Sequence, residues 1–69
     1  MSMQWVRDRY GVPAKRGGRV RYTGDETPQL GTITGTCHGS LRIRLDGERH
    51  SMPFHPTWEL EYLPEVPHV

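Results

Sequence analysis

Residues 40–54 read SLRIRLDGERHSMPF, and this stretch decides the predicted fold. From Leu41 to Leu45, apolar residues alternate with arginines, which is the two-residue period of a half-buried β-strand. The dipeptide Asp46-Gly47 follows at once and favours a tight two-residue turn with positive φ at its centre. The stretch therefore predicts a β-hairpin in which Leu45 lies opposite Glu48.

Counting outward from that turn gives the register of the predicted hairpin. Side chains that face each other across two strands lie on one face of the sheet. One face is then apolar and joins the core, whereas the other carries three arginines. The predicted pairs are Arg44 with Arg49, Ile43 with His50, Arg42 with Ser51 and Leu41 with Met52, and the predicted core side is Leu41, Ile43, Leu45, Met52 and Phe54.

The composition indicates a single small domain. With 69 residues, eight glycines and six prolines, the chain is typical of a β-rich unit with many turns. A chain of this size has room for one small core only. The single cysteine, Cys37, and the lack of an apolar N-terminal run predict a cytoplasmic protein that does not enter a membrane.

The rest of the chain predicts four further elements and a helical turn. Ser2 is a candidate N-cap for a short helix over residues 1–10, and Gly11 ends it. In the GTITGT segment the glycines mark a bulge or a close backbone approach. The predicted elements are the helix, strands at 19–23, 31–36 and 59–63, and one helical turn at 55–58. Residues 1–18 precede the predicted barrel at 19–63, and residues 64–69 form an irregular tail.

Five short strands, a long first loop and a one-turn helix before the last strand describe a mainly β, SH3-like small barrel. The order of loops, strands and glycines from Gly18 to Leu45 resembles the KOW-type version of that barrel. A second resemblance rests on four blocks of the sequence, Tyr10–Gly17, Gly31–Ile33, Leu41–Gly47 and His55–Trp58. These blocks resemble a family of small uncharacterised proteins encoded in phages and prophages of bacteria. The resemblance implies a compact phage or bacterial domain and brings no catalytic residues with it.

Four side chains, Cys37, His38, His50 and His55, are of the kinds that zinc prefers. No second cysteine accompanies Cys37, and the predicted register puts His50 on the core face. Cys37 and His38 are adjacent, so they point apart in a strand or turn and do not suit nucleophilic catalysis. We therefore predict no metal site, no enzymatic activity, no cofactor and no small-molecule substrate.

The aromatic residues allow two interpretations. Small barrels can present aromatic rings as a base-stacking platform or as a cage for a methylated cation. A domain of this size needs large side chains for its core, and four of the rings fall in step with core positions. We therefore predict that Tyr22, Phe54, Trp58 and Tyr62 fill the core and that Trp5 and Tyr10 cover one open end of the barrel.

The charges are unevenly distributed, with +5 in residues 1–24 and −4 in residues 25–69, which sum to the net charge of +1. In an SH3-like barrel the first and last strands are neighbours, so Arg19 and Arg21 are expected to pair with Glu59 and Glu61. The remaining basic residues have no such partners. The predicted anion-binding residues are Arg42, Arg44 and Arg49 of the hairpin together with Lys15 and Arg16 of the flexible basic loop.

These residues favour a non-enzymatic binding module. Guanidinium groups suit bidentate contact with phosphate, so the first hypothesis is binding of nucleic acid, either DNA or RNA. The alternative is a protein-interaction domain that receives a peptide or a larger host or phage protein, either in a groove beside the first loop or by strand addition at an edge.

Overall fold

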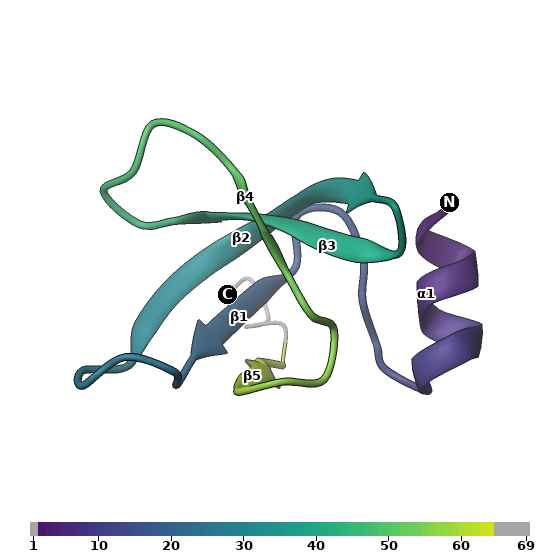
Figure 1. The fold of residues 1–69 in the computed structure, drawn as a ribbon, viewed down its shortest axis with the longest axis horizontal. Helices are drawn as coiled ribbons and strands as arrows, with labels where there is room; N and C mark the ends of the chain where they lie inside the picture. The colour runs from purple at the N-terminus through teal and green to yellow at the C-terminus, as the bar shows by residue number, and fades with distance from the viewer. Residues whose placement is uncertain (1, 65–69) are drawn as a thin grey trace, which may run out of the picture.

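The structure is a computed structural model that describes residues 2–64 (Figure 1). Its fold is mainly β, with a single short helix among the described residues. Apart from Pro64, the predicted tail at 64–69 lies outside the described residues. The elements are α1 (Met3–Tyr10), β1 (Arg19–Tyr22), β2 (Gln29–Cys37), β3 (Ser40–Leu45), β4 (Met52–Phe54) and β5 (Leu60–Tyr62).

The five strands form one antiparallel sheet in the order β4-β3-β2-β1-β5. Each strand up to β4 pairs with the one before it, and β5 returns to lie beside β1. This order is that of an SH3-like small barrel, so the predicted fold class is confirmed. In the described residues no ladder joins the two edge strands, β4 and β5, and the sheet is therefore unclosed.

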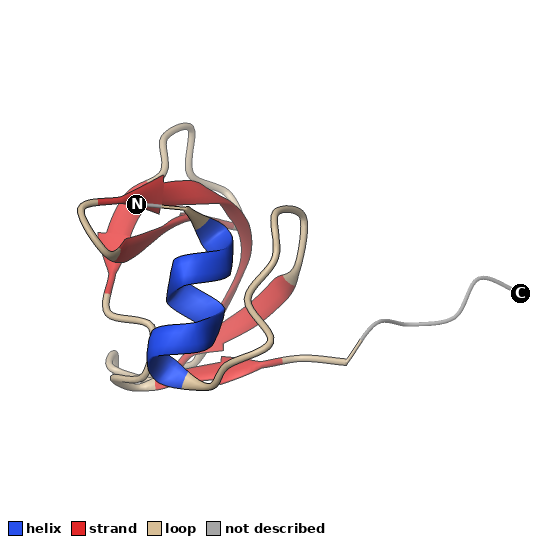
Figure 2. Ribbon diagram, turned by 90° about the vertical axis from the view of Figure 1, so that its right-hand side faces the viewer, coloured by secondary structure: helices blue, strands red, loops and turns tan. Residues whose placement is uncertain are grey.

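The unclosed sheet nevertheless curls strongly. The rings of Tyr22 on β1 and Phe54 on β4 lie 4.9 Å apart between centroids, although two strands separate β1 from β4 in the sheet. Helix α1 lies across one end of the curled sheet (Figure 2). The curl gives the small chain an interior that a flat sheet would lack.

Helix α1 begins and ends as the sequence predicts. The hydroxyl of Ser2 accepts the backbone N–H of Trp5 at 3.1 Å. Gly11 takes a left-handed φ of 66° and donates its N–H to the carbonyl of Arg7. Eight residues make a marginal helix in isolation. Tertiary contacts therefore hold it, namely the buried Val6 and an Arg7 side chain that donates to the carbonyl of Ala14 at 2.7 Å.

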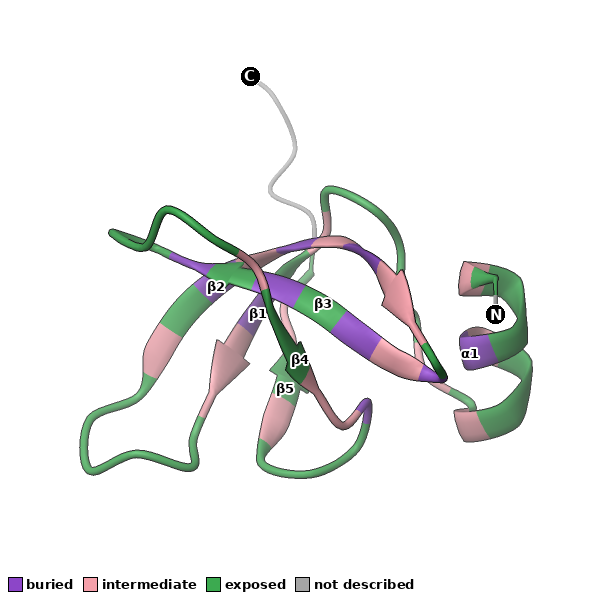
Figure 3. Ribbon diagram, turned by 45° about the horizontal axis from the view of Figure 1, so that its top comes forward, coloured by how far each residue is buried: buried purple, intermediate pink, exposed green. Residues whose placement is uncertain are grey.

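The core follows the alternation of β3. Leu41, Ile43 and Leu45 are buried, whereas the two arginines between them are exposed (Figure 3). Gly31 on β2 faces the same core, and a β-carbon there would stand only 2.8 Å from Cγ2 of Ile43. This confirms the predicted close backbone approach. The buried apolar residues are Val6, Ala14, Val20, Ile33, Leu41, Ile43 and Leu45.

The predicted bulge in β2 is also present. Ile33 pairs with Ile43, but the next pair joins Gly35 to Arg42, so Thr34 is the extra residue. A bulge reverses which residues of a strand face the core. Gly35 therefore pairs with the exposed Arg42 and belongs to the same face of the sheet, although Gly35 itself is buried.

The predicted register of the β3–β4 hairpin is wrong by two residues. Asp46-Gly47 does form a turn, in which Glu48 N–H donates to the carbonyl of Leu45 at 2.9 Å. Only Gly47 has a positive φ there, of 92°, and a turn of that kind splays the strands that it joins. Pairing resumes only at Met52, and the observed pairs are Leu41 with Phe54, Arg42 with Pro53 and Ile43 with Met52.

Several predictions that depended on that register are therefore wrong. Arg49 and His50 lie in the exposed loop between β3 and β4, so Arg49 does not face Arg44 and His50 does not face the core. Met52, predicted as a core residue, is 49% exposed. The tight hairpin lies instead at His38-Gly39, where φ is 48° and 84° and both residues adopt the left-handed conformation that such a turn requires.

The segment between β4 and β5 also differs from prediction. Residues 56–59 form a series of bends instead of one helical turn. Glu59 has a positive φ of 53°, which changes the direction of the chain just before β5. Trp58 is 69% exposed, and its predicted place in the core is wrong. Tyr22, Phe54 and Tyr62 do pack against the core, as predicted.

Replacement of Ile43 tests this description of the core. The Ile43→Ala change should lower the free energy of unfolding by about 2–4 kcal/mol, because Ile43 is 1% exposed and its loss leaves a cavity beside Gly31. Arg42→Ala on the same strand should change it by less than about 0.5 kcal/mol. Urea unfolding measures both. Equal losses for the two variants would mean that the core lies on the other face of β3.

Candidate functional site

Two arginines project from the outer face of the central strand β3. Arg42 and Arg44 lie there because the residues on either side of each face the core. Arg42 stands opposite Gly35, and Arg44 opposite Thr32. The only hydrogen bond of the Arg42 guanidinium in the described residues is a long one of 3.4 Å to the carbonyl of Ser51.

A third arginine reaches the same face from the loop before β1. The turn at Arg16-Gly17 is held against β2, since Gly17 N–H donates to the carbonyl of Ile33 and Ile33 N–H donates to that of Gly18, at 2.8 and 2.9 Å. Nη2 of Arg16 lies 3.7 Å from the point where a β-carbon of Gly35 would stand. Arg16 thus covers Gly35, the residue that faces Arg42.

We call Arg16, Arg42 and Arg44 the basic strip. In residues 2–64 none of the three forms an ion pair with a carboxylate. Arg42 and Arg44 lie two residues apart on one face of β3, so like charges gather on this face and repel each other. Binding of an anion over the strip would remove that repulsion.

The other two arginines of the outer face are neutralised. Arg21 pairs with Glu61 at 3.1 Å, as predicted. Arg19 does not pair with Glu59, which is a correction; it forms a bidentate pair with Asp46, with distances of 2.8 and 2.6 Å. The guanidinium of Arg19 lowers the pKa of Asp46 through these hydrogen bonds.

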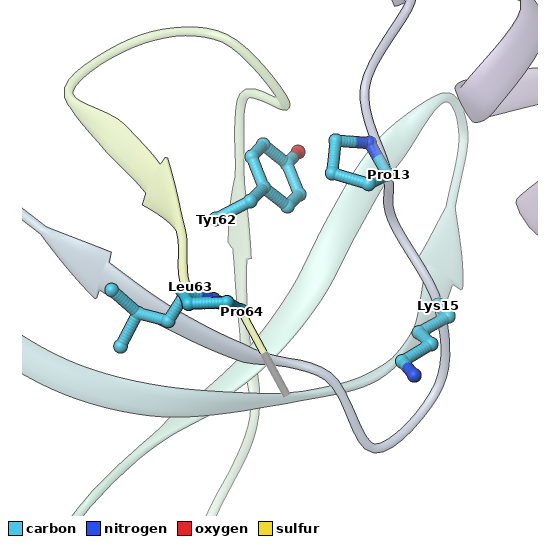
Figure 4. A pocket seen from close by; sticks show the side chains of 5 residues that line it. All are labelled: Pro13, Lys15, Tyr62, Leu63 and Pro64. Atoms are coloured by element: carbon cyan, nitrogen blue, oxygen red, sulfur yellow. The ribbon is translucent and has the colours of Figure 1, made fainter. Parts of the chain in front are cut away.

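Two of the five predicted anion-binding residues lie outside the strip. Lys15 lines an open depression of about 430 Å³ together with Pro13, Tyr62, Leu63 and Pro64 (Figure 4). Arg49 is exposed in the loop between β3 and β4 and makes no ion pair or hydrogen bond with residues 2–64. The structure brings together Arg16, Arg42 and Arg44 only.

The residues considered for metal binding are dispersed. Within the described part of the chain no three His, Cys, Asp or Glu side chains gather closely enough to hold a metal ion. Cys37 is a half-buried free thiol at the end of β2. No helix in that part of the chain has the length and apolar character needed to cross a bilayer.

A row of aromatic rings was missed by the sequence analysis. It begins with Trp5 and Tyr10 of α1, whose centroids lie 6.1 Å apart, and continues to His55, 5.2 Å from Tyr10. Trp58 then stacks on His55 at 4.2 Å, with 12° between the ring planes. We call Trp5, Tyr10, His55 and Trp58 the aromatic ladder. No sequence pattern marks the bends at residues 56–59, where Trp58 is exposed.

The loop that carries Trp58 is well anchored. Pro56 is buried, and its carbonyl accepts the hydroxyl of Tyr62 at 2.7 Å. Burial raises the pKa of Tyr62 to about 12, so this hydroxyl keeps its proton at neutral pH. Nδ1 of His55 accepts the N–H of Thr57 at 3.1 Å. These contacts fix the loop in the form that exposes Trp58.

Comparisons of the chain with protein-family models, with curated proteins and with solved structures found no match. The resemblance to a phage and prophage family therefore stays a prediction. The fold and its surface define the class of the protein as a small β domain with an SH3-like strand order, a basic strip and an aromatic ladder.

The pair between Arg19 and Asp46 gives a prediction about pH. Because the pKa of Asp46 is lower in the folded protein, the pair stabilises the fold above about pH 4 and is lost as the pH falls through the folded pKa. The Asp46→Asn variant should be less stable than the wild type near neutral pH, and this difference should vanish in acid. Urea unfolding at a series of pH values measures it. A difference that is constant with pH would contradict the prediction.

Proposed function

We propose that this protein is a non-enzymatic nucleic-acid-binding module in the cytoplasm and that the basic strip holds its phosphates. The observation that carries the proposal is the convergence of Arg16 and Arg42 over Gly35, with no carboxylate paired to either among the described residues. Unpaired arginines gathered on one face repel each other, and an anion bound over them would reduce that repulsion. Phosphate oxygens accept bidentate hydrogen bonds from guanidinium groups, which suits them to this place.

The strip is also rigid, which favours binding. Arg42 and Arg44 lie on the central part of β3, which has a strand on both sides. Arg16 lies in a turn tied to β2 by two backbone hydrogen bonds. Because the backbone beneath these side chains is held, little backbone entropy is lost when a ligand binds. A grip on phosphates alone is independent of sequence and strongly dependent on salt.

Replacement of single arginines tests the proposal with a matched control. Arg42→Gln should weaken binding of short single- or double-stranded DNA and RNA about five- to tenfold at low salt and reduce the salt slope by about one contact. Arg21→Gln changes the net charge equally, but Arg21 is already paired with Glu61, so its effect should be much smaller. Fluorescence anisotropy across a salt series measures both.

Two results would contradict the proposal. Equal losses for Arg42→Gln and Arg21→Gln would mean that binding follows net charge and not the strip. Absence of any binding by the wild type at low salt, up to hundreds of micromolar protein, would leave a protein partner as the better candidate.

One observation favours that second candidate. The edge strands β4 and β5 each pair with a single strand in the described residues, and an unpaired edge can accept a strand from another protein. Pro53 lacks an N–H and interrupts the edge at β4, so β5 is the better of the two. In a pull-down, a protein that binds through this edge would stay bound after nuclease treatment, whereas one bridged by nucleic acid would not.

A further inference from the structure

The most unusual surface side chain of the described residues is Trp58. In residues 2–64 the hydrophobic core consists of seven buried residues, yet this indole, among the largest side chains of the chain, is 69% exposed. Burial of a large aromatic ring is one of the strongest contributions to the stability of a small domain. A fold that exposes Trp58 loses that contribution to its stability. Contact of the ring with a binding partner would explain why it is exposed.

The exposure of Trp58 does not result from a loose loop. Pro56 is buried, the hydroxyl of Tyr62 donates to the carbonyl of Pro56, and Thr57 N–H donates to His55. His55 covers one face of the indole as a nearly parallel stack, and Tyr10 supports His55 from the side. Trp58 is therefore held as a flat ring that is backed on one face and exposed to solvent overall.

The aromatic ladder continues from the basic strip by way of β4. Pro53 of β4 faces Arg42 on the outer face of the sheet. Phe54 turns inward to the ring of Tyr22, and the following residue, His55, contacts the rings of Tyr10 and Trp58. Two residues of extended chain cover about 7 Å, and this short step joins the strip to the ladder.

The charge beside the ladder is positive. The guanidinium of Arg9 lies 5.7 Å from the centroid of the Tyr10 ring. An exposed aromatic surface with a guanidinium beside it suits the two parts of a nucleotide, with the base on a ring and the phosphate on guanidinium groups. Base pairs in a duplex are stacked on both sides and offer no free face to Trp58.

We propose that the indole of Trp58 stacks with an unpaired nucleobase, which makes single-stranded nucleic acid the ligand of this surface. This proposal rests on the proposed function, because the basic strip holds the phosphates of the same strand. Trp58 reads no sequence, since every base has a π-face. The surface therefore selects single strands over duplexes without preferring one base strongly.

The test measures the contribution of base stacking to affinity separately from that of phosphate contacts. The probes are an oligothymidylate of about 15 nucleotides, an abasic strand with the same number of phosphates, and a duplex of the same length. The wild type should bind the oligothymidylate at least about fivefold more tightly than the abasic strand. Trp58→Ala should remove that difference and leave binding of the abasic strand unchanged. Leu30→Ala, at another exposed apolar residue, is the matched control and should change neither.

The outcomes distinguish this proposal from the function on which it rests. Loss of both affinities in Arg42→Gln, with no effect of Trp58→Ala on either, would overturn stacking and leave the phosphate grip standing. Binding of the oligothymidylate that depends on Trp58 but not on Arg42 would support stacking and overturn the grip. Tighter binding of the duplex than of the single strand, or no binding of any probe, would overturn the stacking proposal.

A spectroscopic readout reports on the ring itself. In a Trp5→Phe background Trp58 is the only tryptophan. Stacking with a base should quench its fluorescence on addition of the oligothymidylate, and the abasic strand should not. Melting curves of each variant check that the fold is retained. Quenching of equal size by both strands would contradict the proposal.

Discussion

The fold depends on the packing of one face of β3 against its neighbours. Leu41, Ile43 and Leu45 are buried on the central strand, and the sheet curls around them until β1 and β4 meet through Tyr22 and Phe54. A domain of this size has few apolar residues with which to offset the entropy of folding. The two arginines of β3 are therefore fixed on the outside by the same packing that buries their neighbours.

The bulge in β2 connects this packing to the surface. Without the extra residue Thr34, Gly35 would face the core, like Ile33. With it, a residue that lacks a β-carbon faces outward beside Arg42, and the side chain of Arg16 occupies the vacant space. The basic strip therefore depends on the shift of the β2–β3 pairing register between Ile33 and Gly35. Arg19 and Arg21 show the contrast, because a carboxylate neutralises each of them.

The exposed aromatic rings and the gathered arginines share one physical feature. Both are arrangements that a fold selected for stability alone would avoid, since one leaves apolar surface in water and the other brings like charges together. Both also lie on well-held backbone, a turn tied to β2 and a loop anchored by Pro56 and Tyr62. Conflicts between local stability and observed structure are expected where a protein binds something.

The sequence by itself determined the features that depend on neighbours along the chain. The alternation of β3, the cap at Ser2 and the end of α1 at Gly11 were predicted from such local patterns. The strand order and the Arg21–Glu61 pair were predicted by way of the SH3-like arrangement that the order of elements indicates. Only the tertiary structure decided the β4 register, the partner of Arg19, and the exposure of His50, Met52 and Trp58. The physical reason is that single backbone angles, at Asp46-Gly47 and at Glu59, redirect whole segments, and the packing of distant residues selects those angles.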